Sequence, residues 1–150
     1  MFGLSVIFFL FFLQSKERMA AAPRFSLEGH EVEAKVVSVY DGDTFTAVFP
    51  LPMHKDSIAY RWSCRIEGID TPELREKDTT KKEIAFKARD FARGLLLDRT
   101  VRISLGAFDK YGRVLCKPYD EQEKPVAASM IEEGFALEYD GKGTRPWALR

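Results

Sequence analysis

Apolar and polar positions alternate along several short stretches of the chain, and this period of two is typical of strands with one buried face. In the stretch 60–66, for example, the apolar positions 60, 62, 64 and 66 fall on one face, and the polar positions 61, 63 and 65 fall on the other. Asp41-Gly42, a strong hairpin signal, separates the first two stretches. The five predicted strands cover residues 32–39, 44–49, 60–66, 101–107 and 113–119.

Two other segments have the period of helices. Apolar residues at positions 84, 88, 91 and 95 recur at spacings of four, three and four, which predicts a helix over 79–97. A second, short helix is predicted to begin near Pro125, because proline suits a first-turn position. It is expected to end at Gly134, because glycine is common just after the last turn.

The elements follow one another as three strands, a helix, two strands and a helix. This order is expected of a closed five-stranded barrel of the OB type, with antiparallel strands and added helices, in the α+β class. Loops at one end of such barrels commonly carry the binding site. A chain of 150 residues is expected to form one such domain, which we assign to residues 26–150.

Residues 1–25 form a separate apolar segment. Its uncharged run 2–13 would extend about 18 Å as a helix, which is short for a hydrocarbon core of about 30 Å. The length suits a secretory signal peptide, and Ala20-Ala21-Ala22 offers a cleavage point. The alternatives are a short membrane anchor, a start assigned too early with Met19 as the initiator, and a helix packed on the domain. A signal or anchor in residues 1–22 predicts a secreted or membrane-associated protein, and its absence an intracellular one.

Composition and charge narrow the classes of function. The chain is 45% hydrophobic, too apolar for a disordered protein, and its 23 Lys plus Arg balance its 23 Asp plus Glu. A neutral chain does not hold nucleic acid by bulk positive charge, so a polyanionic ligand requires local charge or a metal ion. Cys64 and Cys116 lack the spacing of zinc ligands, and we expect buried free thiols, with a disulfide as the alternative.

Three short stretches at predicted strand ends carry the candidate chemistry, namely 41–44, 65–73 and 109–113. They combine several carboxylates with two arginines and contain no His or Cys. Carboxylate oxygens select hard cations such as Ca²⁺ or Mg²⁺, and a guanidinium holds two phosphate oxygens at once. Each stretch alone is more often an ordinary turn or a surface charge. Their combination predicts a phosphodiester site.

In this order, the three stretches resemble the thermonuclease family, typified by staphylococcal nuclease. The resemblance runs from about residue 32 to about residue 147 and includes Gly134-Phe135-Ala136 before Tyr139. It implies a five-stranded OB barrel with helices. It also implies calcium-dependent hydrolysis of DNA and RNA at the 5′ oxygen, which leaves 3′-phosphates, with little sequence specificity.

The resemblance implies a metal site and a base. Calcium would be bound by Asp43, Asp70 and the backbone carbonyl of Thr71, and Asp41 matches a carboxylate near the metal. Glu73 matches the proposed general base. Whether this glutamate deprotonates the attacking water or only orients it is left open by the sequence.

The resemblance also implies residues that contact the substrate, a single-stranded or flexible DNA or RNA chain. Arg65 and Arg113 match arginines on the scissile phosphate. Lys110 and Tyr111 match residues beside a terminal phosphate of the bound nucleotide, and Tyr139 falls near the base-stacking tyrosines of the family. No obligate protein partner is implied, and we expect a monomer.

Two other functions are compatible with the same barrel. One is a binding module that holds single-stranded nucleic acid or a protein without cutting it. Such modules usually lack a catalytic carboxylate or arginine, whereas this chain has the full set. The other is a phosphodiesterase for small nucleotides, although the open end of a barrel suits a chain substrate better.

Overall fold

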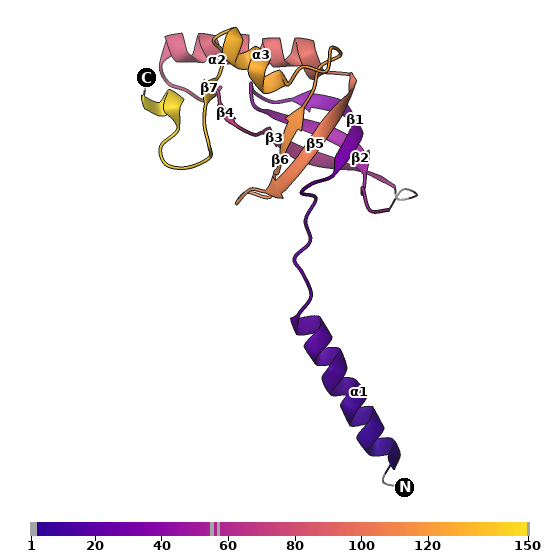
Figure 1. Ribbon diagram of the computed structural model, residues 1–150. Coiled ribbons are helices and arrows are strands. Elements are labelled where there is room, and N and C mark those ends of the chain that lie inside the picture. Colours follow the sequence, from indigo (N-terminus) through magenta and orange to yellow (C-terminus); the bar gives the residue numbers. More distant parts are fainter. Residues whose placement is uncertain (1–2, 55, 57, 150) are drawn as a thin grey trace.

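The computed structural model describes residues 3–54, 56 and 58–149, and at its centre lies a closed barrel (Figure 1). The barrel is formed by five strands, namely β1 (Glu31–Val39), β2 (Thr44–Pro50), β3 (Ala59–Ile66), β5 (Thr100–Phe108) and β6 (Val114–Pro118). Around the barrel they lie in the order β1-β2-β3-β6-β5. The five-stranded OB-type barrel expected from the sequence is therefore confirmed.

One strand pair differs from the expected antiparallel arrangement. β3 and β6 run parallel, with Cys64 opposite Val114 and Ile66 opposite Cys116, whereas the other four pairs are antiparallel. Strand directions in an antiparallel barrel must alternate around the ring. An odd number of strands cannot alternate on a closed ring, so a five-stranded barrel needs one parallel pair.

The inward-facing side chains of the strands fill the barrel. Phe45, Ala47 and Phe49 of β2 are buried, and the residues between them are half-buried, as the alternation predicts. In β1 the register shifts between Val36 and Ser38, where the apolar alternation of the sequence changes phase. A one-residue bulge explains both observations, because it returns the following side chains to the interior.

Two helices cover one end of the barrel, α2 (Thr79–Leu96) and α3 (Val126–Glu132), close to their predicted ranges (Figure 1). The buried residues of α2 are three alanines, at 85, 88 and 92, and Leu96. Of the apolar residues that defined its period, those at 84, 91 and 95 are only half-buried. The buried face is therefore turned slightly from the expected one, because small alanine side chains let the helix lie close to the barrel.

Three short elements were not expected from the sequence. β4 (Ile69–Asp70) pairs antiparallel with β7 (Leu137–Glu138), and a 3-10 helix, η1 (Pro146–Leu149), follows near the C-terminus. A periodic pattern cannot be recognised in two residues. The β4–β7 pair has a functional consequence, because it brings the C-terminal segment beside the 65–73 stretch.

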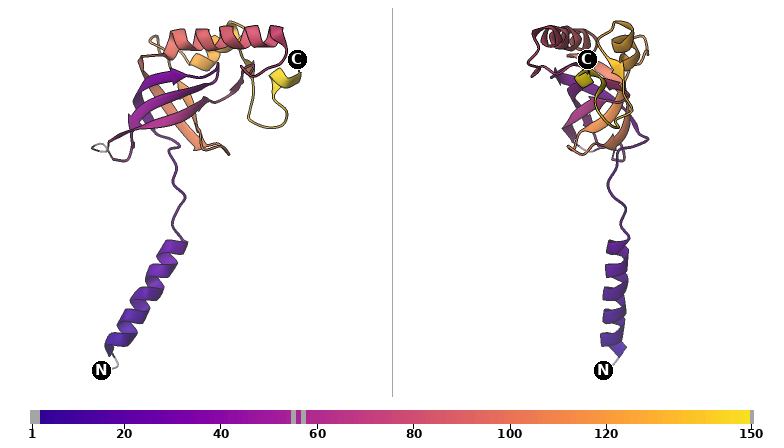
Figure 2. Two further views of the ribbon diagram at one scale, coloured as in Figure 1. Left: turned by 180° about the vertical axis from the view of Figure 1, so that it is seen from behind. Right: turned by 90° about the vertical axis from the view of Figure 1, so that its left-hand side faces the viewer.

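Helix α1 (Gly3–Ala20) stands apart from the barrel at the end of an extended stretch of chain (Figures 1 and 2). It includes residues 3–13 of the apolar run as well as the charged triplet Lys16-Glu17-Arg18. This arrangement differs from a helix packed on the domain, one of the alternatives for this segment. Within the described part of the chain, no helix is both long and apolar enough to cross a membrane.

Candidate active site

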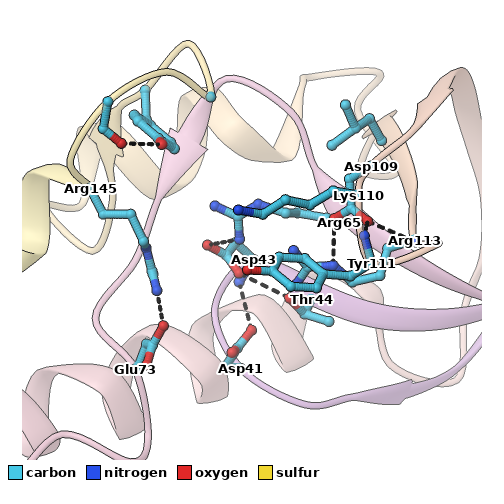
Figure 3. A pocket seen from close by; sticks show the side chains of 14 residues that line it. Asp41, Asp43, Thr44, Arg65, Glu73, Asp109, Lys110, Tyr111, Arg113 and Arg145 are labelled. Carbon is cyan, nitrogen blue, oxygen red and sulfur yellow. Dashed lines mark hydrogen bonds and ion pairs between the residues drawn. The ribbon is translucent and has the colours of Figure 1, made fainter.

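The three chemistry-bearing stretches of the sequence meet around one cavity of about 870 Å³ (Figure 3). The β1–β2 turn supplies 41–44, the end of β3 and the β4 region supply 65–73, and the β5–β6 turn supplies 109–113. Eight of the ten site residues implied by the resemblance line the cavity: Asp41, Asp43, Arg65, Glu73, Lys110, Tyr111, Arg113 and Tyr139. The other two, Asp70 and Thr71, are buried beside it and contact residues of its lining.

The two candidate metal-binding carboxylates are removed from solvent, since Asp43 is 2% exposed and Asp70 is 0% exposed. The backbone N–H of Thr71 donates to Oδ2 of Asp43 over 3.3 Å. The hydroxyl of Thr44 donates to Oδ1 of Asp43 over 3.0 Å. Asp43 and Thr71 are therefore in direct contact, and Asp70 precedes Thr71 in the chain.

The turn that carries Asp41 is packed tightly against this pair. A Cβ atom placed on Gly42 would lie 2.9 Å from Cγ2 of Thr71, so only glycine allows the observed approach. Oδ1 of Asp41 accepts the N–H of Asp43 over 3.4 Å. Burial, and after it the negative charge of Asp43, raises the pKa of the Asp41 carboxyl to about 6.

Arg65 connects the two buried carboxylates. Its position on β3 directs it away from the barrel interior and into the cavity, as the alternation of Cys64 and Ile66 predicts. Nη1 of Arg65 lies 2.6 Å from Oδ2 of Asp43, and Nη2 lies 3.9 Å from Oδ1 of Asp70. Nη2 also donates to the carbonyl of Ile69 over 3.3 Å. The guanidinium is thus held at the junction of the β1–β2 turn and β4.

The second candidate phosphate-binding arginine, Arg113, is held by the β5–β6 turn. Oδ1 of Asp109 accepts the N–H groups of Tyr111 and Arg113, over 2.8 and 2.9 Å, and Oδ2 accepts Nε of Arg113 over 2.7 Å. The ring of Tyr111, which is exposed, lies 5.0 Å from Nζ of Lys110 and 5.3 Å from Cζ of Arg113. The turn therefore fixes one guanidinium and presents a cation and an aromatic ring beside it (Figure 3).

The sequence analysis missed a third arginine in the site. Arg145 lies in the C-terminal segment and lines the cavity. Its Nε donates to Oδ1 of Asp70 over 2.6 Å, and its Nη2 donates to the carbonyl of Thr71 over 2.9 Å. Its Nη1 forms an ion pair with Glu73 (Figure 3). No motif spacing marks Arg145, which lies among glycines and polar residues before Pro146. The β4–β7 pair and the hydrogen bond from the Trp147 N–H to Asp70 bring its segment to the cavity.

Glu73 and Tyr139 occupy the more open side of the cavity. Glu73 is 56% exposed in its side chain and follows the buried Thr71 by two residues. The hydroxyl of Tyr139 donates to the carbonyl of Gly143 over 3.1 Å, and the backbone N–H of Tyr139 donates to the carbonyl of Gly68 over 2.9 Å. These two bonds anchor Tyr139 at the edge of the cavity.

The donor atoms beside the cavity fit a hard cation in chemical type. Asp43 and Asp70 supply carboxylate oxygens and Thr71 supplies a carbonyl oxygen, which are ligands that Ca²⁺ prefers. Among the described residues, no group of three or more His, Cys, Asp and Glu side chains is placed to hold a metal. A cation at this position would therefore depend on two carboxylates, the backbone oxygen and water. Those protein oxygens contact Arg65 and Arg145 in the structure.

Comparisons with known proteins show the family to which the chain belongs. A family model described as staphylococcal nuclease homologue matches residues 63–146. A protein named probable endonuclease LCL3 from Uncinocarpus reesii is 29% identical over 126 residues, which are 72% of this chain and 42% of that protein. A protein of the same name from Yarrowia lipolytica is 25% identical over 141 residues, 82% of this chain and 62% of that protein. The match thus spans less than two thirds of each relative. Because the family model covers more than half of the chain, the protein belongs to the staphylococcal nuclease homologue family.

Proposed function

We propose that this protein is a calcium-dependent nuclease that hydrolyses phosphodiester bonds of DNA and RNA with little sequence specificity. Cleavage on the 5′-oxygen side would leave 3′-phosphates. The observation that carries the proposal is the convergence of Arg65, Arg113 and Glu73 on one cavity, beside the buried carboxylates of Asp43 and Asp70. Relatives named probable endonuclease support it. The nuclease unit would comprise residues 26–150 and act as a monomer.

The two arginines would bind the scissile phosphate. Each is fixed by a carboxylate, Arg65 by Asp43 and Arg113 by Asp109, so neither has to be ordered when substrate binds. Asp109 binds Nε of Arg113, and among the described residues the two Nη atoms of Arg113 have no hydrogen-bond partner. Preorganised donors of this kind stabilise the negative charge that develops on phosphate oxygens in the transition state.

Glu73 would act on the attacking water, by orienting it or by accepting its proton. Its side chain is open to solvent and faces the same cavity as the arginines. A candidate base must reach the proton that it accepts, and water has free access to this carboxylate. In the structure the Glu73 carboxylate forms an ion pair with Arg145 at the cavity wall.

Asp43, Asp70 and the carbonyl of Thr71 would hold the calcium ion. The ion would supply positive charge next to the phosphate. Asp41, behind Asp43, would keep the β1–β2 turn in place through its bond to the Asp43 N–H. Lys110 and Tyr111 would contact a phosphate of the substrate, and Tyr139 would stack on a base.

The test is incubation of the full chain with single-stranded DNA and with RNA, in calcium or in a chelator. We expect cleavage only with calcium, and products with 3′-phosphate ends. An intact substrate under both conditions would contradict the proposal. Comparison of a polymer with a dinucleotide separates a nuclease from a phosphodiesterase that acts on small nucleotides.

Site variants separate the enzyme from a binding module. Glu73→Gln and Arg113→Ala should each lower kcat/KM by about 10²-fold or more while affinity for single-stranded DNA changes little. Lys124→Ala is the matched control, because Lys124 forms an exposed ion pair with Glu132 away from the cavity. If the protein is a binding module, neither the unaltered chain nor any of these variants should cleave single-stranded DNA.

A further inference from the structure

We propose that Arg145 is a built-in competitor of the divalent cation, because its guanidinium binds oxygens that the cation requires. The cation would bind only when the Arg145 side chain leaves Asp70 and Thr71. The inference rests on the proposed function, which assigns a cation to these oxygens, and goes beyond it by giving the C-terminal segment control over cation affinity.

The contacts of Arg145 coincide with the candidate metal ligands. Nε and Nη2 lie 2.6 and 2.5 Å from Oδ1 of Asp70, and Nη2 donates to the Thr71 carbonyl over 2.9 Å. Nη1 pairs with Glu73. One planar group thus engages two of the three proposed ligands and the proposed base. Arg102 also pairs with two carboxylates, but those of Glu31 and Glu123 are exposed, whereas Asp70 is fully buried.

The Arg145 guanidinium and a divalent cation would compete for Oδ1 of Asp70, the oxygen that Arg145 approaches with two nitrogens. Asp70 is fully buried, and its Oδ2 accepts the N–H of Trp147 over 3.0 Å, whereas Oδ1 accepts no backbone N–H among the described residues and is the more available oxygen for a cation. Oδ1 already has two nitrogens of Arg145 beside it. Two positive groups a few ångströms apart repel strongly where little water screens them. Occupation by one therefore excludes the other.

The surroundings allow Arg145 to leave without unfolding the site. The side chain of Arg145 is 32% exposed, whereas Trp147, two residues later, is buried and anchored to Asp70 by its backbone. Gly141 and Gly143 precede Arg145 in the same exposed loop, with φ of +83° and +69°. The Arg145 side chain can swing into solvent while Trp147 holds the end of the segment.

Calcium titration calorimetry on the full chain and its variants tests the competition. If Arg145 blocks the site in nine molecules of ten or more, Arg145→Met should bind Ca²⁺ about tenfold or more tightly than the unaltered protein. Lys142→Met is the matched control, since it removes one positive charge from the same segment and Lys142 is not among the partners of Asp70 or Thr71. Its affinity should change by less than about twofold, and this small effect should vanish in high salt.

If Arg145→Met does not fold, the variant Arg145→Lys and the fluorescence of Trp147 still test the competition. Arg145→Lys keeps the charge but has a single donor group, and should show an intermediate calcium affinity. In Trp62→Phe, Trp147 is the remaining tryptophan, so calcium should shift its fluorescence as the Arg145 contacts to Asp70 break. The same titration in Trp62→Phe with Arg145→Lys should reach its midpoint at lower calcium.

Three outcomes would overturn the inference. Equal calcium affinity in Arg145→Met and the unaltered protein, with calcium-dependent cleavage intact, would refute the competition and leave the proposed function standing. Weaker binding in the variant would show that Arg145 supports the site instead. No calcium binding in either protein, together with no cleavage, would refute both proposals.

Discussion

Nη1 of Arg65 lies 2.6 Å from Oδ2 of Asp43, so a candidate phosphate-binding arginine and a candidate metal ligand form a buried ion pair. The register of β2 on β3 sets this pair, because Thr44, the neighbour of Asp43, lies opposite Arg65. The side chains of Arg65 and Asp43 are 13% and 2% exposed, so water screens their attraction little. Each partner therefore depends on the other for its place in the site.

Arg65→Ala should lower the free energy of unfolding by about 3–5 kcal/mol, because it leaves the carboxylate of Asp43 buried without its cation. The double variant Arg65→Ala with Asp43→Asn should lose less free energy of unfolding than the sum of the losses in the two single variants. The difference, which is the coupling energy of the pair, should be about 0.5–3 kcal/mol. Urea unfolding followed by circular dichroism measures both. Lys124→Ala, which breaks an exposed pair, should cost less than about 1 kcal/mol. Additive losses at Arg65 and Asp43 would contradict the pairing.

Local patterns were sufficient to predict the barrel but not the pairings that close it. Alternation along 44–49 and 60–66 located β2 and β3. In β2 every second residue is buried, whereas in β3 only Cys64 and Ile66 are buried and Tyr60, on the same predicted face, is exposed. The parallel β3–β6 pair follows from ring closure, which no short stretch encodes. β4 and β7 have two residues each, so they leave no period to detect.

The candidate site also has residues that local patterns predict and one that depends on long-range contacts. Its predicted residues lie in strand ends and tight turns, where short motifs such as Asp41-Gly42-Asp43 constrain the backbone. Arg145 was not predicted from the sequence, because its contact with Asp70 spans 75 positions and depends on the β4–β7 pair. Local spacing says nothing about such a contact.

Asp109→Asn should weaken both the β5–β6 turn and catalysis. Burial alone would raise the pKa of Asp109, but the N–H groups of Arg113 and Tyr111 and the Arg113 guanidinium outweigh it and hold the pKa below 3.8. A lowered pKa stabilises the fold above the unfolded value, and this contribution is lost as the pH falls below 3.8 through the folded value. The wild-type advantage, about 1–2 kcal/mol near neutral pH, should therefore shrink below about pH 4.

Urea unfolding as a function of pH measures this advantage, and Asp120→Asn is the control. Oδ1 of Asp120 accepts two backbone N–H groups, from Gln122 and Lys124, as Oδ1 of Asp109 does with its own turn. Among the described residues, however, Asp120 binds no arginine of the cavity. Asp120→Asn should leave cleavage of single-stranded DNA unchanged, whereas Asp109→Asn should lower kcat/KM because Arg113 loses its anchor. Equal effects of the two variants on cleavage would refute the anchoring role.

Gly42→Ala and Gly94→Ala should change stability in opposite directions. A Cβ atom at Gly42 would meet Cγ2 of Thr71 at 2.9 Å and Cβ of Ala88 at 3.1 Å, so the variant should lose about 1–3 kcal/mol. At Gly94, in α2, a Cβ atom meets no heavy atom within 4 Å, and alanine should gain about 0.5–1 kcal/mol. Thermal unfolding in one buffer compares them. A loss of similar size at both positions would show that the close approach to Thr71 is not the cause.

Cys64 and Cys116 should resist thiol reagents in the native protein. Both are buried free thiols on the paired strands β3 and β6, as expected from the sequence. Burial, and after it the neighbouring Cys64, raises the pKa of the Cys116 thiol well above its ordinary value, and the thiolate is the reactive form. Iodoacetamide labelling read by mass spectrometry should therefore modify neither cysteine at neutral pH, and both in denaturing guanidinium chloride without reductant. Labelling that occurs only after a reductant is added would show a disulfide instead, and fast labelling of the native chain would show that the barrel opens around β6.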